Sequence, residues 1–592
     1  MKLSDYVMDC IAEQGVAHVF EMIGGAIAHL LDSTYDRQDI ECVSVHHEQS
    51  AAFAAEGYAR VNGRLGVAMA TSGPGALNLI TGIGSCYFDS VPCLFVTGQV
   101  NTYEYKGDRP VRQIGFQETD IVSIVRPIVK YAEMICEPER IRYGLEKAVF
   151  LARHGRPGPV LLDLPMNVQR ADIDPQQLPS FFGSEEHRQL LAEPPPVTSR
   201  DIQAVTAMLE KAQRPLILAG GGVRASGASA ELRELVELTG IPVVHSLLGL
   251  DALPGVHPAS AGLIGAYGNR YSNLAAANCD LLLVLGSRLD TRQTGTRPST
   301  FARGALKVHV DIDKAELNEK VRVDKALHAD VKSFLCRLVK SLQRTQLPDF
   351  SGWRAMMNSW QKRYPSGSPV PSSGAVEPNR FMELLSACSS DGDLFVLDVG
   401  QHQMWASQSL HLREGQRLLN AGGMGAMGFA LPAAIGACKA EPGRRVIVIA
   451  GDGGIQVNIQ ELNTMARHRL PIKIFVMNNR TLGMVRQFQD MYFDGRRQST
   501  VGSYTCPDLL AIAEAYGLPA SRIKLHCEAE QAIKDALDAE GGVLVEVELS
   551  MDSAVTPKLA VHHPIEQMSP ALPPGELESV MVVDMLDKED IG

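Results

Sequence analysis

Short apolar runs alternate with longer amphipathic stretches along nearly the whole chain, and this rhythm limits the fold more than any other feature. Such runs occur at 66–70, 94–97, 216–219, 281–285, 394–397 and 446–450. Each is bounded by glycine, proline or an acidic residue, and its side chains are apolar on both faces, as in strands covered on both sides. The alternation predicts an α/β protein whose sheets are mostly parallel and flanked by helices.

Two proline-rich stretches interrupt the alternation. The first, 171–200, contains three consecutive prolines, and the second, 345–379, contains five prolines among serines and glycines. Such compositions are typical of linkers. They divide the 592 residues into three α/β blocks, 1–175, 196–342 and 376–560, followed by a tail at 561–592. In the tail we expect a short docking helix after Pro574.

The charge balance and the cysteines exclude several classes of protein. Because 56 Lys and Arg face 68 Asp and Glu, the net charge is −12, and nucleic acid and anionic membranes are not expected partners. The eleven cysteines form no C-x-x-C pair, which favours a reducing compartment over a disulfide framework. No signal segment is recognised, and no apolar run approaches the ~18 residues that span a bilayer. We therefore expect a soluble cytoplasmic protein.

The strongest motif follows the apolar run at 446–450. It reads Gly451-Asp452-Gly453-Gly454, and Asn479, part of an Asn-Asn pair, lies 27 positions after Asp452. A helix pattern and a strand pattern separate the two ends, so both should lie at the carboxyl edge of adjacent parallel strands. Carboxylate and amide oxygens suit Mg²⁺, and glycines let the backbone approach a diphosphate. Either half alone would indicate only a turn, but together they predict a diphosphate and magnesium site.

This pairing is typical of thiamine-diphosphate enzymes, and the whole chain resembles their acetolactate (acetohydroxyacid) synthase branch. The matching motifs lie at 47–49, 55–60, 71–75, 116–120, 156–159, 398–405, 422–432 and 482–487. They occur in the same order as in that branch and extend over about residues 1–570. The resemblance implies a pyrimidine-binding domain, a central Rossmann-like domain and a diphosphate-binding domain.

The resemblance also implies roles for particular residues. Glu48 would protonate N1′ of the aminopyrimidine, Met427 would support the folded cofactor, and the Gly425 carbonyl would accept a hydrogen bond from the 4′-amino group. The magnesium ligands would be Asp452, Asn479 and the backbone carbonyl of Thr481. The other residues expected to contact thiamine diphosphate are Pro74, Asn78, Gly400, Gln401, His402, Gly451, Gly453, Gly483 and Met484. Glu48 of one subunit would face Asp452 of another, so a homodimer or homotetramer is expected.

The central block carries a weaker signal for a second nucleotide. Gly220, Gly221 and Gly222 follow the run at 216–219, but no complete G-x-G-x-x-G fingerprint is present. Segments 285–295 and 309–313 resemble the FAD segments of acetolactate synthases. The resemblance implies a structural, non-redox FAD in contact with the three glycines and with Arg288, Asp290, Arg292, Asp311, Ile312 and Asp330. An empty or ADP-binding domain is the alternative.

The substrate side departs from the family at several positions. The residues implied to meet substrate are Gly25, Phe116, Gln117, Met166, Val485 and Phe488. Met166 stands where the family usually has lysine, Phe488 stands where it has tryptophan, and the loop 262–265 lacks a usual histidine. Glu21 is expected to bring an acid close to the cofactor. The donor side thus resembles a pyruvate site, whereas the acceptor side is altered.

The hypothesis that results is a carboligase dependent on thiamine diphosphate and Mg²⁺. It would decarboxylate pyruvate, a small 2-keto acid, and join the hydroxyethyl carbanion to a second carbonyl, giving 2-acetolactate when that carbonyl is pyruvate. The main alternative is a related flavin-containing carboligase with another acceptor, such as a keto-sugar nucleotide. A 2-keto acid decarboxylase and a pyruvate-oxidase-like enzyme are further alternatives. The presence of Glu48, Asp452 and Asn479 argues against a binding module without activity.

Overall fold

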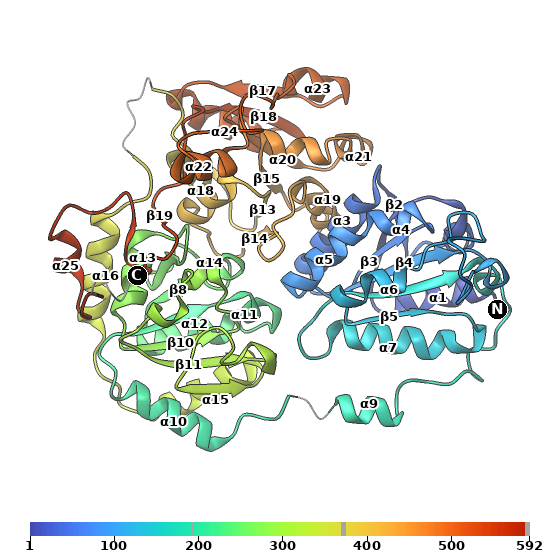
Figure 1. Cartoon of the computed structure of the whole chain (residues 1–592), viewed down its shortest axis with the longest axis horizontal. Coiled ribbons are helices and arrows are strands. Elements are labelled where there is room, and N and C mark those ends of the chain that lie inside the picture. The colour runs from blue at the N-terminus through green and yellow to red at the C-terminus, as the bar shows by residue number, and fades with distance from the viewer. Residues whose placement is uncertain (192–193, 369–373, 587–592) are drawn as a thin grey trace.

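Each of the three blocks folds around one parallel sheet of six strands, which confirms the predicted fold class. The computed structural model describes residues 1–191, 194–368 and 374–586. Figure 1 shows the first domain in blue, the central domain in green and yellow, and the third domain in orange and red. The strand orders are β2-β1-β3-β4-β6-β5, β12-β11-β10-β7-β8-β9 and β14-β13-β15-β16-β18-β17.

The strands lie where the apolar runs predict them. The first sheet contains β1 (His18–Met22), β2 (Glu41–Ser44), β3 (Gly66–Ala70), β4 (Cys93–Gln99), β5 (Tyr131–Met134) and β6 (Val160–Pro165). The central sheet contains β7 (Pro215–Ala219), β8 (Val243–His245), β9 (Ser260–Leu263), β10 (Leu281–Leu285), β11 (Leu306–Asp311) and β12 (Lys325–His328). The third sheet contains β13 (Leu394–Leu397), β14 (Arg417–Asn420), β15 (Val446–Gly451), β16 (Ile472–Asn478), β17 (Ala520–Ile523) and β18 (Val543–Glu548).

Helices cover both faces of every sheet. Those of the first domain are α1 (Leu3–Glu13), α2 (Ala28–Asp32), α3 (Glu48–Asn62), α4 (Pro74–Asn78), α5 (Ile80–Asp89), α6 (Ile121–Val125), α7 (Ile141–Arg153) and α8 (Met166–Gln169). Those of the central domain are α10 (Ser199–Leu209), α11 (Gly221–Ala225), α12 (Ser229–Thr239), α13 (Arg270–Asn278), α14 (Thr291–Thr294) and α15 (Val331–Leu342). Those of the third domain are α17 (Pro378–Cys388), α18 (Gln401–Ser409), α19 (Ala430–Ala440), α20 (Asp452–Val457), α21 (Glu461–Arg467), α22 (Gly483–Tyr492), α23 (Leu509–Ala515) and α24 (Ala529–Asp538).

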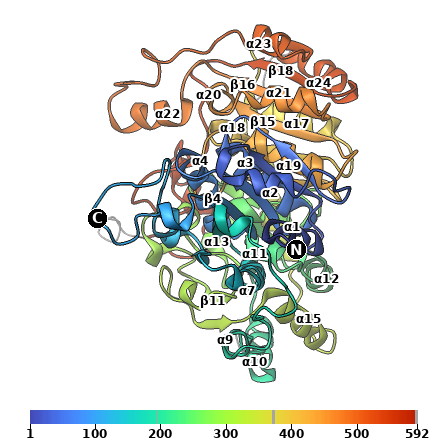
Figure 2. The same cartoon turned by 90° about the vertical axis from the view of Figure 1, so that its right-hand side faces the viewer.

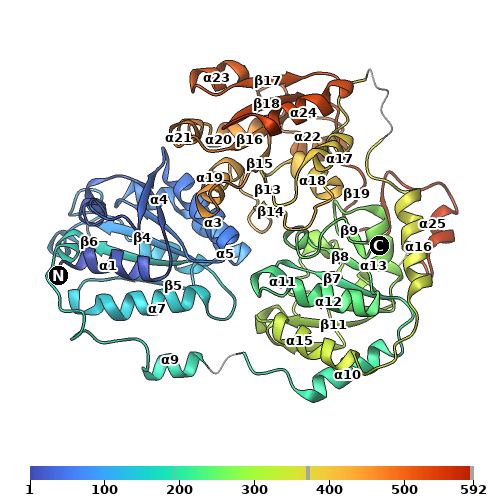
Figure 3. The same ribbon diagram turned by 180° about the vertical axis from the view of Figure 1, so that it is seen from behind.

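Helices α3 and α19 join the first domain to the third. They lie side by side in the views of Figures 1, 2 and 3. A side chain on Gly57 would overlap the carbonyl oxygen of Ala433, and one on Gly436 would overlap that of Ala54. The two helices therefore approach closely at small residues, and a single apolar core continues from the first sheet to the third.

The second proline-rich stretch is not only a linker, contrary to the prediction. It contains the helix α16 (Ser351–Arg363), whose Trp353, Met357 and Trp360 are buried in the core of the central domain. These residues recur at i, i+4 and i+7, so they form one apolar stripe. Prolines on both sides of the helix hide this pattern in the sequence.

The first proline-rich stretch and the tail also pack on the domains. Phe181 is buried against the first domain, and the short helix α9 (Glu185–Leu190) follows it. In the tail, β19 (Lys558–Leu559) and β20 (Met568–Ser569) form an antiparallel hairpin. The expected helix after Pro574 is α25 (Glu576–Val580), and its Val580 is buried in the central domain. Of the residues described, none lies in a helix long and apolar enough to cross a membrane.

Candidate functional site

A cavity of about 840 Å³ lies between the third and central domains, at the carboxyl ends of both sheets. This is the edge at which parallel sheets bind ligands. Its volume is within the upper part of the ~300–1,000 Å³ range typical of cofactor and ligand pockets. Most of the predicted site residues of these two domains line it.

The glycine–aspartate motif forms the turn from β15 into α20. Asp452 is buried, and its Oδ2 accepts a hydrogen bond of 2.8 Å from the hydroxyl of Tyr504. Burial raises the pKa of Asp452 to about 6, because its charged form loses hydration. A divalent cation would reverse this cost, since it stabilises the carboxylate directly.

Asn479 and Thr481 lie at the end of the neighbouring strand, β16. The amide of Asn479 donates to Gln401 Oε1 at 2.9 Å, and its own oxygen accepts from the backbone N–H of Thr481 at 3.3 Å. Both residues line the cavity with Asp452. Within the described chain no three His, Cys, Asp or Glu side chains gather as a metal cluster. A set of one carboxylate, one amide oxygen and one backbone carbonyl is nevertheless suited to Mg²⁺.

His402 lies between the two glycine-rich turns. A side-chain carbon on Gly400 would lie 2.6 Å from its Cε1, and one on Gly451 would lie 2.8 Å from its Nδ1. Its Nε2 is buried without a hydrogen-bond partner, and burial lowers the pKa of the ring to about 3. A neutral imidazole whose Nε2 lacks a partner in a cavity fits a bound polar group, because a buried polar atom is otherwise costly.

The loop with Gly425 and Met427 is anchored by Asp398, whose role the sequence reasoning missed. Asp398 accepts hydrogen bonds from the N–H groups of Gly428 at 2.9 Å and Ala430 at 3.3 Å. Gly425 has φ +72°, a conformation that favours glycine. Met427 is partly exposed and lines the cavity. The signal that could have indicated Asp398 is its place directly after β13, at the ligand-binding edge of the sheet.

Helix α22 brings Val485, a predicted substrate residue, to the same cavity, whereas the other, Phe488, does not line it. Met484 and Val485 line the cavity near its first turn. Phe488 follows one turn later and is partly exposed, in contact with the ring of Tyr492. Gly483 begins the helix, and a side chain there would overlap Gln401 Oε1. The backbone of this turn therefore lies directly against the amide that also contacts Asn479.

The predicted residues of the first domain lie elsewhere. Glu48 begins α3, and its Oε2 accepts a hydrogen bond of 2.9 Å from the amide of Asn78. Gly75 is so close that a side-chain carbon there would lie 3.1 Å from Glu48 Oε1. The members of this first-domain set are Gly25, Glu48, Pro74, Asn78, Phe116, Gln117 and Met166. Among the described residues that line the cavity, none comes from this set.

The central domain contributes its predicted residues to the far end of the cavity. Gly220 does not line the cavity. The predicted residues that do line it are Gly221, Gly222, Arg288, Asp290, Arg292, Asp311, Ile312 and Asp330. Gly222 donates to the carbonyl of Gly286 at 2.9 Å, and a side-chain carbon would lie 2.6 Å from the Cα of Gly286. These glycines connect the ends of β7 and β10, where the strand order reverses, which is the usual nucleotide crevice of such sheets.

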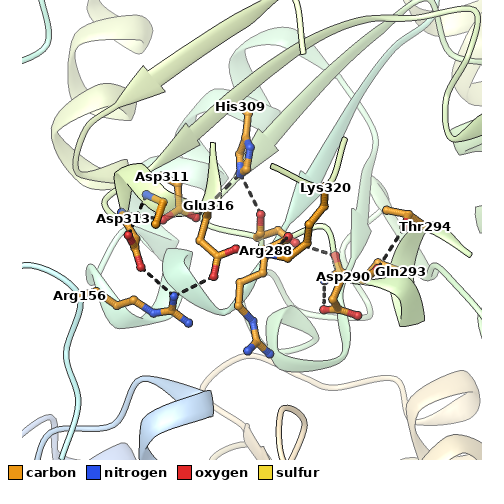
Figure 4. Close-up of polar contacts among 12 residues, drawn as sticks. Arg156, Arg288, Asp290, Gln293, Thr294, His309, Asp311, Asp313, Glu316 and Lys320 are labelled. Atoms are coloured by element: carbon orange, nitrogen blue, oxygen red, sulfur yellow. Dashed lines mark hydrogen bonds and ion pairs between the residues drawn. The ribbon is translucent and has the colours of Figure 1, made fainter. Parts of the chain in front are cut away.

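The polar residues around this far end are drawn in Figure 4. Asp290 caps α14 and accepts from the side chain of Gln293 at 2.7 Å. Burial raises the pKa of Asp311 to about 6. The Nδ1 of His309 is buried without a partner. Figure 4 shows the guanidinium of Arg288 pointing away from the other labelled side chains. This end therefore offers both donors and acceptors to a ligand.

Arg156 connects the first domain to this network. It lies 3.0 Å from Asp313 and 2.9 Å from Glu316, both of the central domain. Both acids belong to the segment that follows β11, directly after Asp311. The sequence analysis quoted the motif at 156–159 without giving Arg156 a role. Its ion pairs fix the cavity wall between the two domains.

Comparison with known proteins identifies relatives along the whole chain. Three models match in order: the thiamine pyrophosphate enzyme N-terminal TPP binding domain at 1–124, the central domain at 202–338 and the C-terminal TPP binding domain at 398–547. The acetolactate synthase large subunit of Parasynechococcus marenigrum is 36% identical over 97% of this chain and 90% of its own. That of Lactococcus lactis is 36% identical over 94% of each chain. The probable acetolactate synthase large subunit of Methanocaldococcus jannaschii is 37% identical over 92% of each.

Proposed function

We propose that this chain, which belongs to the thiamine pyrophosphate enzyme family and to its acetolactate synthase branch, catalyses a carboligation. It removes CO₂ from pyruvate and joins the remaining two-carbon unit to a second carbonyl compound. When that compound is also pyruvate, the product is 2-acetolactate. The observation that carries the proposal is the cavity that Asp452 and Asn479 line together with His402, whose Nε2 lacks a hydrogen-bond partner. The relatives do not favour the keto-sugar nucleotide as acceptor.

The cavity residues fit thiamine diphosphate and Mg²⁺. Asp452, Asn479 and the carbonyl of Thr481 would hold the metal, and the backbone at Gly400, Gly451, Gly453 and Gly483 would approach the diphosphate together with Gln401 and His402. Met484, Met427 and the Gly425 carbonyl would contact the thiamine rings. Bound thiamine diphosphate supplies a nucleophilic carbon and an electron sink for decarboxylation. The protein's part is to position the cofactor, exclude water and supply a proton site at Glu48.

Glu48 reaches a cofactor only if a second subunit takes part. Its first-domain neighbours expose large apolar side chains, with Ile23 66% exposed, Leu77 42% and Phe116 85%. Apolar surface of this kind marks an interface, and a two-fold axis would place each such edge on the partner's cavity. We therefore assign Glu48, Pro74 and Asn78 to the partner's thiamine diphosphate, in a homodimer or in a homotetramer built from such dimers.

FAD is the proposed second cofactor, in a structural rather than a redox role. Support comes from the far end of the cavity, where Gly221 and Gly222 lie at the reversal of strand order. Arg288, Arg292, Asp311 and the other predicted residues there offer the donors and acceptors that a dinucleotide needs. Flavin absorbance of the purified protein tests this proposal. A colourless protein that takes up no added FAD would contradict it.

The substrate site would combine residues from both subunits. Gly25, Phe116, Gln117 and Met166 of one chain would meet Val485 and Phe488 of the other, beside the thiamine rings. The apolar side chains on both sides would enclose a compact 2-keto acid such as pyruvate. Because the described cysteines are all unpaired, a reducing compartment such as the cytoplasm is proposed, and cell fractionation tests it.

Product analysis tests the activity itself. The protein is incubated with thiamine diphosphate, Mg²⁺ and pyruvate, and the products are identified by NMR. Acetolactate is the expected product. Acetaldehyde would identify a decarboxylase, peroxide with acetate would identify an oxidase, and CO₂ release only after addition of another carbonyl would identify a different acceptor. Unaltered pyruvate under all these conditions would overturn the proposal.

A further inference from the structure

The loop 420–428, which we call the ring loop, carries Gly425 and Met427, two residues proposed to contact the thiamine rings. Both line the cavity and are exposed to it. A side-chain carbon on Gly425 would lie no closer than 4.0 Å to any described atom beyond its chain neighbours. The position of this middle part therefore depends on how the two ends are held. The second end is held within the third domain, where Asp398 accepts from the N–H of Gly428 at 2.9 Å.

The first end of the ring loop is held by Asp89 of the first domain, the last residue of α5. Its Oδ2 accepts from the N–H of Gly422 at 3.0 Å, and its Oδ1 accepts from the N–H of Gly423 at 2.6 Å. Two consecutive backbone groups thus use both oxygens of one carboxylate. The side chain is 1% exposed. Because hydrogen bonds to a buried charge are roughly twice as strong as neutral ones, this attachment is firm.

Arg60, in the last turn of α3, holds the start of the ring loop as well. Its Nη1 donates to the carbonyl of Asn420 at 2.8 Å. The same atom lies 3.2 Å from Glu56 Oε1 and 3.8 Å from Asp89 Oδ2. Burial raises the pKa of Glu56, and the charge of Arg60 offsets part of that rise. One guanidinium therefore connects two buried carboxylates with the backbone of the loop.

The attachment also lies against the central domain. A side-chain carbon on Gly423 would lie 2.6 Å from Asp89 Oδ1 and 3.1 Å from Nη2 of Arg288. Burial raises the pKa of Asp89, whereas the charges of Arg60 and Arg288 lower it in part. Figure 4 shows the Arg288 guanidinium directed away from the polar network of its own domain. The backbone at Gly423 is thus enclosed by a carboxylate and a guanidinium from two other domains.

We propose that Asp89 and Arg60 are positioning residues, which fix the first end of the ring loop and thereby the places of Gly425 and Met427 against the thiamine rings. This inference rests on the proposed thiamine diphosphate site and adds two first-domain residues to it. The first domain would then serve two cofactors, that of its own chain through Asp89 and that of the partner through Glu48. Neither positioning residue touches the reacting carbon.

Exchange of the C2 proton of bound thiamine diphosphate tests the inference. This proton exchanges rapidly only when the 4′-amino group reaches C2, so the rate reports how the two rings are held. The holoenzyme, saturated with thiamine diphosphate and Mg²⁺, is mixed with D₂O, quenched in acid and read by ¹H NMR. No pyruvate and no acceptor are added. Calorimetry on the same proteins gives the affinity for thiamine diphosphate.

The main variant is Asp89→Asn, whose amide group cannot accept from the second backbone N–H. Its exchange rate should fall by roughly tenfold to a hundredfold, the cost of a small misplacement of reacting groups. Its affinity for thiamine diphosphate should stay close to that of the wild type, because the diphosphate and metal residues are unchanged. The matched control is Asp280→Asn. Asp280 also accepts from two consecutive backbone N–H groups, both at 2.8 Å, but at the amino end of β10, so exchange should be normal.

A second variant, Arg60→Lys, keeps the charge but not the planar fork that reaches Asn420. Its exchange rate should fall by roughly threefold to tenfold. This variant decides the question if Asp89→Asn does not fold. Exchange within twofold of the wild type in the folded variant would overturn the inference. A lower thermal midpoint with unchanged exchange would do so too, because these residues would then only join the domains.

The same measurement separates this inference from the proposed function. If the wild type exchanges the C2 proton rapidly but releases no CO₂ from pyruvate with any acceptor, the proposed carboligation fails. Slower exchange in Asp89→Asn would still support the positioning role. If acetolactate forms and Asp89→Asn exchanges normally, the proposed function stands and the positioning role is refuted.

Discussion

The first and third sheets have equivalent carboxyl edges, yet the two edges differ in how far one chain completes them. At the third sheet, Asp452, Asn479 and His402 are buried around a cavity. At the first sheet, Glu48 is close to Asn78, but Ile23 and Phe116 beside it face outward. At the third sheet the residues of one chain form a cofactor pocket, and we call this the finished edge. At the first sheet they form an exposed surface, which we call the open edge. The difference supports the proposed pair of chains, in which the partner's open edge would cover each finished edge.

The largest expected effect comes from Glu48→Gln. The amide cannot share a proton with the cofactor ring, so turnover should fall by roughly 10²–10⁴-fold, the usual value of a general acid–base group. Steady-state CO₂ release measures this. Glu41→Gln, at an exposed acid paired with Lys439, is the control and should retain activity. Turnover of Glu48→Gln within twofold of the wild type would show that the carboxyl edge of the first sheet takes no part in the reaction.

Mixing two inactive variants tests whether the edges of different chains meet. Glu48→Gln and Asp452→Asn are co-expressed with separate affinity tags, and the double-tagged species is isolated. In a two-fold dimer, one of its two sites receives both native residues, so about half of the wild-type activity per dimer should return. If both edges served the same chain, every site would keep one defect. The isolated mixed dimer would then be as inactive as either parent.

Gly483→Ala should weaken cofactor binding through the finished edge alone. A side chain there overlaps the Gln401 amide that accepts from Asn479. We expect about tenfold lower affinity for thiamine diphosphate, with a loss of roughly 1–3 kcal/mol in the free energy of unfolding, as for other overpacked sites. Calorimetry and thermal unfolding measure the two. Gly502→Ala, with open space around it, is the control. Normal affinity for Gly483→Ala would show that this turn does not approach the cofactor.

Gly25→Ala should have the smallest effect of these substitutions, and it separates an effect on the stability of one chain from an effect on the paired enzyme. Within one chain a side chain at Gly25 meets nothing within 4 Å. Stability should therefore stay within about 0.5 kcal/mol of the wild type. In the paired enzyme the same methyl group would crowd the partner's site, and the KM for pyruvate should rise a few-fold. Lower stability together with a normal KM would mean that Gly25 matters only to its own domain.

The sequence predicts the sheets and the finished edge well, for a physical reason. Strands buried on both faces are continuous apolar runs, so β3 and β10 begin and end at the predicted residues. Asp452 and Asn479 can be recognised from the local sequence, because each directly follows a strand. Parallel topology then brings the two strand ends together without further information. The partner cofactor proposed for Glu48 would depend on a second chain, which no local pattern encodes.

Other features escape the sequence because they depend on contacts between distant segments. Prolines conceal α16, although its apolar stripe is regular. Glu21 accepts a hydrogen bond from Ser44 of the neighbouring strand, a contact that no motif indicates. Asp89 lies 333 residues before Gly422, and only the fold brings its carboxylate to that backbone N–H.

The packing of α3 on α19 also has a consequence for synthesis on the ribosome. The first helix ends at Asn62 and the second begins at Ala430, so about 370 residues separate them. At translation rates of ~5–20 residues per second, roughly 20 to 70 s pass before the second helix exists. Throughout that interval, the alanine-rich face around Gly57 has no native cover. The nascent first domain is thus an expected client of chaperones that bind exposed apolar surface.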